Sequence, residues 1–159
     1  MHCPCISSML CFVGAALGRE GGTIKSMILP FWLGLGGPIN SGKQWFPWIH
    51  ADDVAGIINH ALEHDNVTGV LNAVAPQQCT NAEFTRAFGQ ALWRPAFLPM
   101  PGFVINLMLG SDRASVVNEG AKIVPKRTLE YGYKFLYPDI NSACKDCAHL
   151  LSSSGDFKM

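Results

Sequence analysis

The side chains best suited to metal or redox chemistry are two cysteine pairs, one near each end of the chain. Cys3 and Cys5 form a C-x-C, and Cys144 and Cys147 form a C-x-x-C. A zinc site would need both pairs to meet in space, with their thiolates held by turns. The residues from Asp139 onward instead have the pattern of a helix, with the second pair on one apolar stripe. We therefore expect buried free thiols there, and reduced cysteines are typical of an intracellular protein, in the cytoplasm or an organelle matrix rather than secreted.

Histidine and tyrosine spacings give little support to catalysis. His60 and His64 are four residues apart on an expected helix, a spacing that can hold a metal, but H-E-x-x-H is missing. We interpret this pair as part of a solvated helix face. No G-x-S-x-G motif accompanies the histidines. No tyrosine is followed four positions later by lysine, so the carbonyl-reducing Y-x-x-x-K pair is absent from the sequence.

A glycine-rich stretch follows the apolar run 9–13 and has two interpretations. A dinucleotide-binding loop needs G-x-G-x-x-G or a close variant, so that the backbone can approach a pyrophosphate. Gly14, Gly18 and Gly21 are spaced differently, with bulky and charged side chains between them. The acidic residue expected about 20 positions later is also missing from 39–43. The pattern favours a turn after a strand, with a phosphate loop as the lesser alternative.

Composition excludes several classes of protein. The chain has 159 residues, enough for one domain with a real core, and 12 basic residues balance 12 acidic ones. No block of Lys and Arg supports a nucleic-acid footprint or a membrane patch, and no apolar run reaches the roughly 20 residues of a membrane span. Because 48% of residues are hydrophobic and only 15% charged, we expect some apolar surface to meet a partner.

Strand-like and helix-like segments alternate in the first 95 residues, which is typical of a parallel sheet with covering helices. The expected elements are a strand at Met9–Val13, a helix over 24–31 bent or ended by Pro30, an aromatic strand over 44–50 interrupted by Pro47, a helix over 54–63, a buried strand over 69–75 and a helix from Thr80 to Leu92. After Pro95 we expect short helical pieces at 103–109, 114–119 and 126–131, a brief strand near 134–135, and a last helix from Asp139 to about Leu151.

Two of these helices have capping sequences. Thr80 and Glu83 form the capping box S/T-x-x-E, in which each side chain bonds the backbone of the other residue. Asp52 and Asp53 precede the helix over 54–63, and we interpret Asp52 as its cap, since a carboxylate there suits the helix dipole. That helix is expected to bury one side, formed by Val54, Ile57, Ile58, Ala61 and Leu62.

Four stretches, in this order, resemble the extended short-chain dehydrogenases/reductases. They are Pro47-Trp-Ile-His-Ala-Asp-Asp-Val-Ala55, Gly69-Val-Leu-Asn-Ala-Val-Ala-Pro76, Thr80-Asn-Ala-Glu-Phe84, and the segment 117–143 with its Gly120-Ala-Lys-Ile-Val-Pro125. The branch they resemble is the epimerase family proteins, described as NADP-dependent oxidoreductases and as cell-division-inhibitor-like. The resemblance covers residues 14–151.

The resemblance implies an α/β fold: a partial Rossmann-type parallel sheet without its early strands, and a small, mostly helical C-terminal lobe. Family members carry a G-x-x-G-x-x-G loop and the reductase-type active site before the region that matches here. We expect residues 1–13 to lie outside the family, 14–95 to form the remnant of the Rossmann-type domain, 96–151 the C-terminal lobe, and 152–159 a disordered tail.

The resemblance also implies roles for particular residues. The segment 14–18 is similar to the family's "G-v-v-L-G" beside the nicotinamide, so the backbone of Ala16 is the candidate cofactor contact. His50 and Asn72 would face the substrate, with a structural role as the alternative. Arg113, and likewise Lys126 and Arg127, would meet an anionic substrate group or remain on the surface. The aromatic residues Trp45, Phe46 and Trp48 would line the interface between the two lobes.

The resemblance finally implies an activity for the family: members bind NADP and transfer a hydride to or from a small-molecule carbonyl or alcohol. We expect this chain to supply the substrate-side lobe, to bind NADP weakly, and to have no catalytic residue or activity of its own. Two alternatives stay open. The chain could be an interaction fragment that holds a partner through apolar surface, or an incomplete isoform without catalytic function.

Overall fold

The computed structural model describes residues 9–18, 22–34, 36–96 and 120–148. The expected helical pieces at 103–109 and 114–119, the tail 152–159, Arg113, and the cysteines at 3 and 5 lie outside these residues. None of the helices among these residues combines the length and the apolar character that a membrane span requires.

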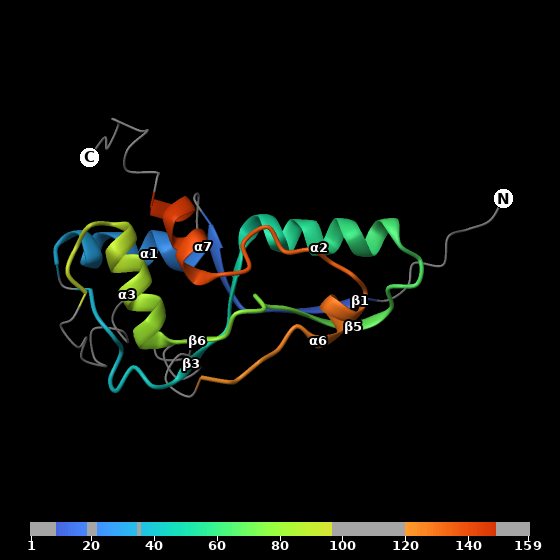
Figure 1. Ribbon diagram of the computed structural model, residues 1–159, viewed down its shortest axis with the longest axis horizontal. Helices are drawn as coiled ribbons and strands as arrows, with labels where there is room; N and C mark the ends of the chain where they lie inside the picture. Colours follow the sequence, from blue (N-terminus) through green and yellow to red (C-terminus); the bar gives the residue numbers. More distant parts are fainter. Residues whose placement is uncertain (1–8, 19–21, 35, 97–119, 149–159) are drawn as a thin grey trace.

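The central feature is a long strand that changes partner midway (Figure 1). Its first part, β1 (Met9–Val13), pairs in parallel with β5 (Gly69–Ala73). Its second part, β2 (Ala15–Gly18), pairs in parallel with β4 (Trp48–His50). The switch occurs at Gly14, whose N–H donates to the Ala73 carbonyl (3.1 Å), while the next N–H donates to Pro47 (2.7 Å). The expected parallel sheet is confirmed, in two short pairs.

The prediction that residues 14–18 form a turn is wrong, because four of these five residues form β2. Gly14 has no positive φ that would require glycine. A Cβ at this position would instead lie 2.7 Å from the carbonyl oxygen of Pro47. The glycine is therefore needed for the close approach of two backbones. The expected strand at 9–13 is confirmed, and it pairs with β5. That residues 1–13 lie outside the family stays a prediction.

Pro47 divides the aromatic segment into two strands, as its lack of an N–H predicts. Before it, β3 (Trp45–Phe46) pairs antiparallel with β6 (Cys79–Thr80). After it, β4 pairs in parallel with β2, in a separate sheet. The short segment thus connects two sheets.

Helices pack around these strands in two groups (Figure 1). The larger core joins α1 (Gly22–Trp32), α3 (Asn81–Ala91) and α7 (Ile140–Ala148) to β2 and the aromatic residues of β3 and β4. The smaller core lies between α2 (Ala51–Glu63) and the β1–β5 pair. A short helix, α6 (Lys126–Glu130), lies against β5. The expected helices are confirmed within the described residues, with Pro30 inside α1.

The start of α2 differs from its prediction. The cap is His50, whose Nδ1 accepts a hydrogen bond from the N–H of Asp52 (3.2 Å). Asp52 itself points to solvent, with 63% of its side chain exposed. Asp53 is fully buried and bonds elsewhere. The helix begins two residues earlier than a cap at Asp52 would require, so the prediction of that cap is wrong.

The brief strand expected near residues 134–135 does not form. The segment between α6 and α7 has no strand partner and instead crosses the beginning of α2. Its backbone N–H groups at Leu136 and Tyr137 donate to the carboxylate of Asp53. A side chain therefore supplies the acceptors that a neighbouring strand would otherwise provide.

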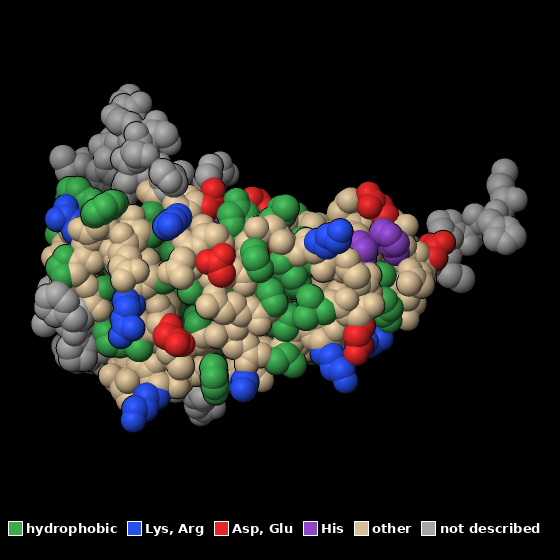
Figure 2. Space-filling model, viewed as in Figure 1, with side chains coloured by type: hydrophobic (Ala, Val, Ile, Leu, Met, Phe, Trp, Pro, Cys, Tyr) green, Lys and Arg blue, Asp and Glu red, His purple; other side chains and the backbone are tan. Residues whose placement is uncertain are grey.

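Apolar side chains remain exposed on several elements. On α2, Ile57 is buried as expected, but Ile58 and Leu62 are 42% and 78% exposed, so the predicted buried side is wrong at these two positions. On β1, Phe12 is 57% exposed, and it adjoins half-exposed positions on the same strand and on β5. Figure 2 shows hydrophobic side chains gathered across the middle of one face, with histidines over the end of α2. Apolar surface is exposed at these sites, and its contact with a partner stays a prediction.

The Thr80 capping box forms in full and gives a first prediction. Thr80 Oγ1 accepts from the N–H of Glu83 (3.3 Å), and the Glu83 carboxylate accepts from the N–H of Thr80 (2.7 Å). Replacing Thr80 by Ala removes one acceptor from the exposed end of α3. We expect T80A to lower the free energy of unfolding by about 1 kcal/mol in urea denaturation at pH 7.

The same box has a pH dependence of defined sign. The hydrogen bonds from Thr80 hold the pKa of Glu83 below its ordinary value. A depressed folded-state pKa contributes stability above the unfolded pKa, and this stability is lost as the pH falls through the folded value. The difference in stability between the wild type and Glu83→Gln should therefore shrink as the pH is lowered from 7 to below 4. An unchanged difference would show that the carboxylate charge has no part in the cap.

Candidate functional site

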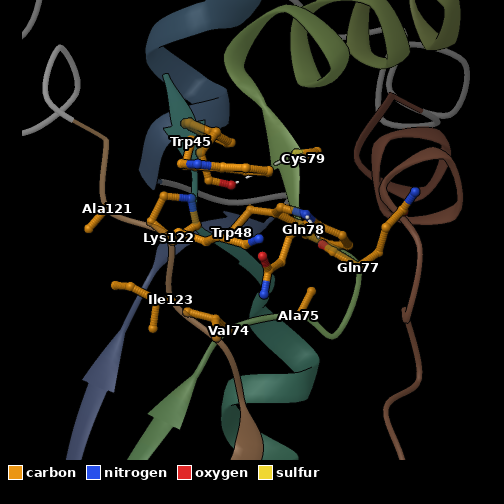
Figure 3. A pocket seen from close by; sticks show the side chains of 12 residues that line it. Trp45, Trp48, Val74, Ala75, Gln77, Gln78, Cys79, Ala121, Lys122 and Ile123 are labelled. Atoms are coloured by element: carbon orange, nitrogen blue, oxygen red, sulfur yellow. Dashed lines mark hydrogen bonds between the residues drawn. The ribbon is translucent and has the colours of Figure 1, made fainter. Parts of the chain in front are cut away.

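A shallow pocket opens where β5 ends and β4 begins (Figure 3). Its volume is about 220 Å³, including space open to solvent. The walls come from β3 and β4, from the segment 74–79 that follows β5, and from the segment 121–123. In parallel sheets, ligands bind outside the carboxyl ends of strands. The pocket is therefore the candidate functional site of the described chain.

Two indoles form the floor and one wall of this pocket. Trp48 is buried, and its Nε1 donates to the carbonyl of Gln77 (3.1 Å). The Gln77 amide oxygen accepts from the N–H of Ile140 (2.7 Å), which connects the pocket to the start of α7. Trp45 is half-buried and lies under the ammonium of Lys122, 4.7 Å from the ring centre. These contacts fix both rings and bring one positive charge to the mouth.

The segment 120–123 approaches the aromatic strand closely. Gly120 has φ +48, and a Cβ there would lie 2.5 Å from the carbonyl oxygen of Trp45. Trp45 and Trp48 both line the pocket opposite this segment. Phe46 points mainly into the core, where it stacks on Phe84 with ring centres 4.3 Å apart.

His50 is placed by α2, α7 and the segment between α6 and α7. Its side chain is 2% exposed, and its ring lies 3.9 Å from that of Tyr137. Because Nδ1 accepts from the Asp52 N–H, the neutral ring carries its proton on Nε2. Nε2 lies 3.3 Å from the carboxylate of Asp146, although the geometry makes no hydrogen bond. This burial gives His50 a structural role whatever else it does.

Asn72 and Arg127 attach the C-terminal segment to β5. The Asn72 amide donates to the carbonyl of Val124 (3.1 Å). The Arg127 guanidinium donates to the carbonyls of Thr68 (2.9 Å) and Val70 (3.1 Å). Three positions were expected to meet an anion, and two of them are described. Arg127 binds backbone carbonyls at the start of β5, and Lys126 is exposed beside Glu130.

The structure brings only some of the candidate residues together. Ala16 lies in β2 opposite Ile49, and the next register pair joins Leu17 to His50. Ala16 and His50 are therefore neighbours across one ladder. Asn72 belongs to the other pair of strands, opposite Phe12. Arg113 lies outside the described residues.

Asp53 is the residue that sequence analysis missed. Its carboxylate is fully buried and accepts from Leu136 N–H (2.7 Å), Tyr137 N–H (3.0 Å) and the Tyr133 hydroxyl (3.0 Å). Burial, followed by this bond to Asp53, raises the pKa of Tyr133. The sequence held one signal for this role: Asp52 and Asp53 are adjacent, and a single cap leaves the second carboxylate free to bind other donors.

The cysteines of α7 are buried, as expected, and give a third prediction. Burial raises the pKa of Cys144 and raises that of Cys79 to about 12. Alkylation requires the thiolate. We expect the Cys79 and Cys144 peptides to remain unmodified by iodoacetamide at pH 8 in the native protein, as read by mass spectrometry.

The control is the same reaction in 6 M guanidinium, where both peptides should be alkylated fully. Fast alkylation of Cys144 in the native protein would contradict its burial. No group of three or more metal-ligating side chains occurs among the described residues.

Comparisons of the sequence and of the structure with known proteins both find epimerase family proteins. Residues 100–147 match a family described as a domain of unknown function (DUF1731). The chain is 55% identical over 134 residues to Epimerase family protein SDR39U1 of Bos taurus, covering 84% of this chain and 46% of that protein. The human protein of that name is 53% identical over 133 residues, covering 84% and 45%. The chain thus spans about half the length of these curated relatives.

Solved structures agree. The human epimerase family protein SDR39U1 (isoform2), crystallised with NADPH, superposes with a TM-score of 0.84 at 51% identity, over 89% of this chain and 48% of that one. UDP-glucose 4-epimerase of Thermus thermophilus, at 15% identity and a TM-score of 0.66 over 93% of this chain and 48% of that one, shares the fold. The Rossmann-type α/β fold, with a partial sheet, is therefore confirmed. The chain is a homologue of the C-terminal part of the epimerase family proteins.

Proposed function

We propose that this chain forms the substrate-side part of an NADP-dependent oxidoreductase or epimerase acting on a small molecule. The observation that supports this proposal most strongly is its likeness to the human relative crystallised with NADPH. In this proposal the chain is not an enzyme by itself, since no described residue forms a tyrosine–lysine proton-transfer pair. NADP, when bound, supplies the hydride chemistry.

The described residues fit the nicotinamide end of NADP but not its phosphates. β2 pairs with β4 alone among the described strands, so the opposite edge of Ala16 can meet a nicotinamide ring. No described segment supplies a phosphate cradle, because the stretch 14–18 is a strand whose first glycine fits against Pro47. The proposal therefore assigns Ala16 a backbone contact and expects this chain to bind NADPH weakly.

The proposal assigns the substrate side to His50, Asn72 and Arg113. His50 adjoins Ala16 across the β2–β4 ladder, which places it near the expected nicotinamide. Its buried ring would act by holding the end of β4 in place. The Asn72 amide would orient the segment at Val124. Arg113 would meet an anionic group. The proposed setting is the cytoplasm or an organelle matrix, and the relative from Arabidopsis thaliana is named chloroplastic.

The proposal assigns the nucleotide-binding half of the site to a segment or partner outside the described residues. Phe12 and Val13 of β1 are 57% and 49% exposed, and β1 pairs with β5 alone among the described strands. Such an edge is ready to accept another strand. Mixing the chain with the N-terminal half of the human relative should give a 1:1 complex that binds NADPH.

The control for this assembly is a pair of variants with similar exposure. Phe12→Asp should abolish the complex, whereas Leu29→Asp, on the exposed side of α1 and 59% exposed in the wild type, should leave it intact. A stable monomer that ignores the N-terminal half would favour an interaction module with another partner. A chain that aggregates alone and with the N-terminal half would favour an incomplete isoform.

A further inference from the structure

The two edges of the β1–β5 pair differ. Carbonyl groups of alternate residues in a strand point to the same side, so β5 has one edge toward β1 and one edge away from it. The carbonyl of Ala73 faces the β1 side, because it accepts from the N–H of Gly14 (3.1 Å). The carbonyls of Thr68, Val70 and Asn72 face α6 instead. A further strand at this outer edge of β5 would need those three carbonyls as acceptors.

Two side chains of α6 already occupy these acceptors. The Arg127 guanidinium donates through Nη2 to the carbonyl of Thr68 (2.9 Å) and through Nη1 to that of Val70 (3.1 Å). The Thr128 hydroxyl donates to the carbonyl of Asn72 (3.0 Å). Adjacent residues of one short helix thus take the place of the N–H groups of a neighbouring strand, and we call these two side chains the edge cap.

The surroundings hold the edge cap in place. Gly69 has φ +80, and a Cβ there would lie 3.1 Å from Nη1 of Arg127, so the glycine lets the guanidinium lie against the strand. The Tyr131 hydroxyl accepts from Nη2 (3.1 Å), and the centre of its ring is 5.7 Å from the guanidinium carbon. Thr128 is 1% exposed. Water therefore has poor access to the bond between Thr128 and Asn72, which makes this donor hard to replace.

The outer edge of β1 has no equivalent cover in the described part of the chain. β1 pairs with β5 alone among the described strands, and none of the described side chains hydrogen-bonds the backbone of residues 11–13. Phe12 and Val13 are 57% and 49% exposed on this strand. An uncovered edge is a template for another strand, whereas a covered edge is protected from one. The pair of strands therefore has one open edge and one closed edge.

From this asymmetry we propose that Arg127 and Thr128 close the β5 edge, so that another strand adds to this chain at β1 and not at β5. The proposed function requires only that the nucleotide-binding half meets β1. The edge cap adds the exclusion of strands from the opposite edge. Without it, the partner at β5 would be a second copy of this chain, because a two-fold axis can pair two identical edges.

Sedimentation velocity of the 159-residue chain tests the edge cap over a concentration series. All proteins carry Phe12→Asp, which places a charge at the open β1 edge and leaves the β5 edge as the one under test. Adding Arg127→Ala and Thr128→Val uncaps the three carbonyls beside Val70, which is itself 40% exposed. We expect this change to raise the self-association constant about tenfold or more. Hydrogen exchange of the β5 peptide should slow as the dimer forms.

Three further variants separate the edge cap from charge and from stability. Lys126→Ala removes a positive charge from the same helix, but this ammonium lies beside Glu130 (3.9 Å), so self-association should not change. Thr128→Ser keeps the hydroxyl and should behave as the Phe12→Asp parent does. Thr128→Val alone removes the hydroxyl at nearly constant volume and should raise self-association about threefold. If the triple variant does not fold, the comparison of Thr128→Val with Thr128→Ser decides.

The proposal is overturned if the uncapped chain associates no more than its parent, or if Lys126→Ala has an equal effect. Association that leaves hydrogen exchange in β5 as fast as in the monomer would also overturn it. Neither NADPH nor the N-terminal half is present in these measurements. A failure here therefore leaves the proposed function standing, and failure of the proposed complex at β1 would leave the edge cap standing.

Discussion

Replacing Asp53 by Ala should destabilise the fold more than the loss of any other side chain at the start of α2. The carboxylate accepts three hydrogen bonds, and its removal leaves the N–H groups of Leu136 and Tyr137 without their acceptor. The Tyr133 hydroxyl keeps only its bond to the backbone carbonyl of residue 53 (3.3 Å). Charge-assisted bonds and stranded donors together cost about 3–5 kcal/mol. We expect a fall in melting temperature of roughly 10 °C, measured by circular dichroism.

Asp52 provides the matched control, since it is the same residue type at the same helix start. Its side chain is 63% exposed, so Asp52→Ala should cost about 0.5 kcal/mol or less. Tyr133→Phe removes one of the three bonds to Asp53 and should fall between the two. Equal effects at Asp52 and Asp53 would contradict the assignment of Asp53 as the anchor of the segment between α6 and α7.

Gly14→Ala should destabilise the chain by about 2–3 kcal/mol, because the new Cβ would lie 2.7 Å from the Pro47 carbonyl oxygen. The Pro47 carbonyl is backbone and a Cβ is held rigidly by its Cα, so the overlap is relieved only by moving β2 away from Pro47. Without such overlap the same change would stabilise the chain by about 0.4–1 kcal/mol, since alanine restricts the unfolded state. The sign of the effect, read from urea denaturation, therefore decides the role of this glycine.

The control for this substitution is Gly34→Ala. Nothing lies within 4 Å of a Cβ at Gly34, but its φ is +74, so the expected cost of about 1 kcal/mol comes from backbone strain alone. If Gly14→Ala proved neutral or stabilising, the close approach of β2 to Pro47 would not hold in solution.

Local signals in the sequence predicted most of the elements. The Thr80 capping box predicted the start of α3, because both of its bonds form within four residues. Pro47 predicted the break between β3 and β4, since proline has no N–H for a ladder. The C-x-x-C spacing on an apolar stripe predicted that Cys144 and Cys147 would be buried.

Long-range contacts account for the errors. The sequence around Gly14 predicts a turn because nothing local shows that Pro47 approaches it. Asp52 and Asp53 cannot be told apart as caps without knowing that the segment after α6 crosses the start of α2. That crossing also removes the expected strand near residues 134–135. The exposed Leu62 fits the helical period but has no partner among the described residues that buries it.

In the candidate site, too, some residues could be predicted from the sequence and others could not. The resemblance directs attention to Ala16 and His50, which the structure places on neighbouring strands. The pocket is predicted only in part, since Trp45 and Trp48 are expected at an interface, but Lys122 and Gln78 have no recognisable motif. These residues meet through the antiparallel β3–β6 pair and the close approach at Gly120, which depend on tertiary packing.

Calorimetric titration of the purified chain with NADPH tests the account most directly, with the full-length human relative as the control. The account predicts saturable binding by the relative and none by this chain up to about millimolar cofactor, where affinity would amount to roughly 4 kcal/mol. Saturable binding with micromolar affinity by this chain alone would contradict it, and would return the stretch from Gly14 to Gly21 to consideration as a phosphate loop.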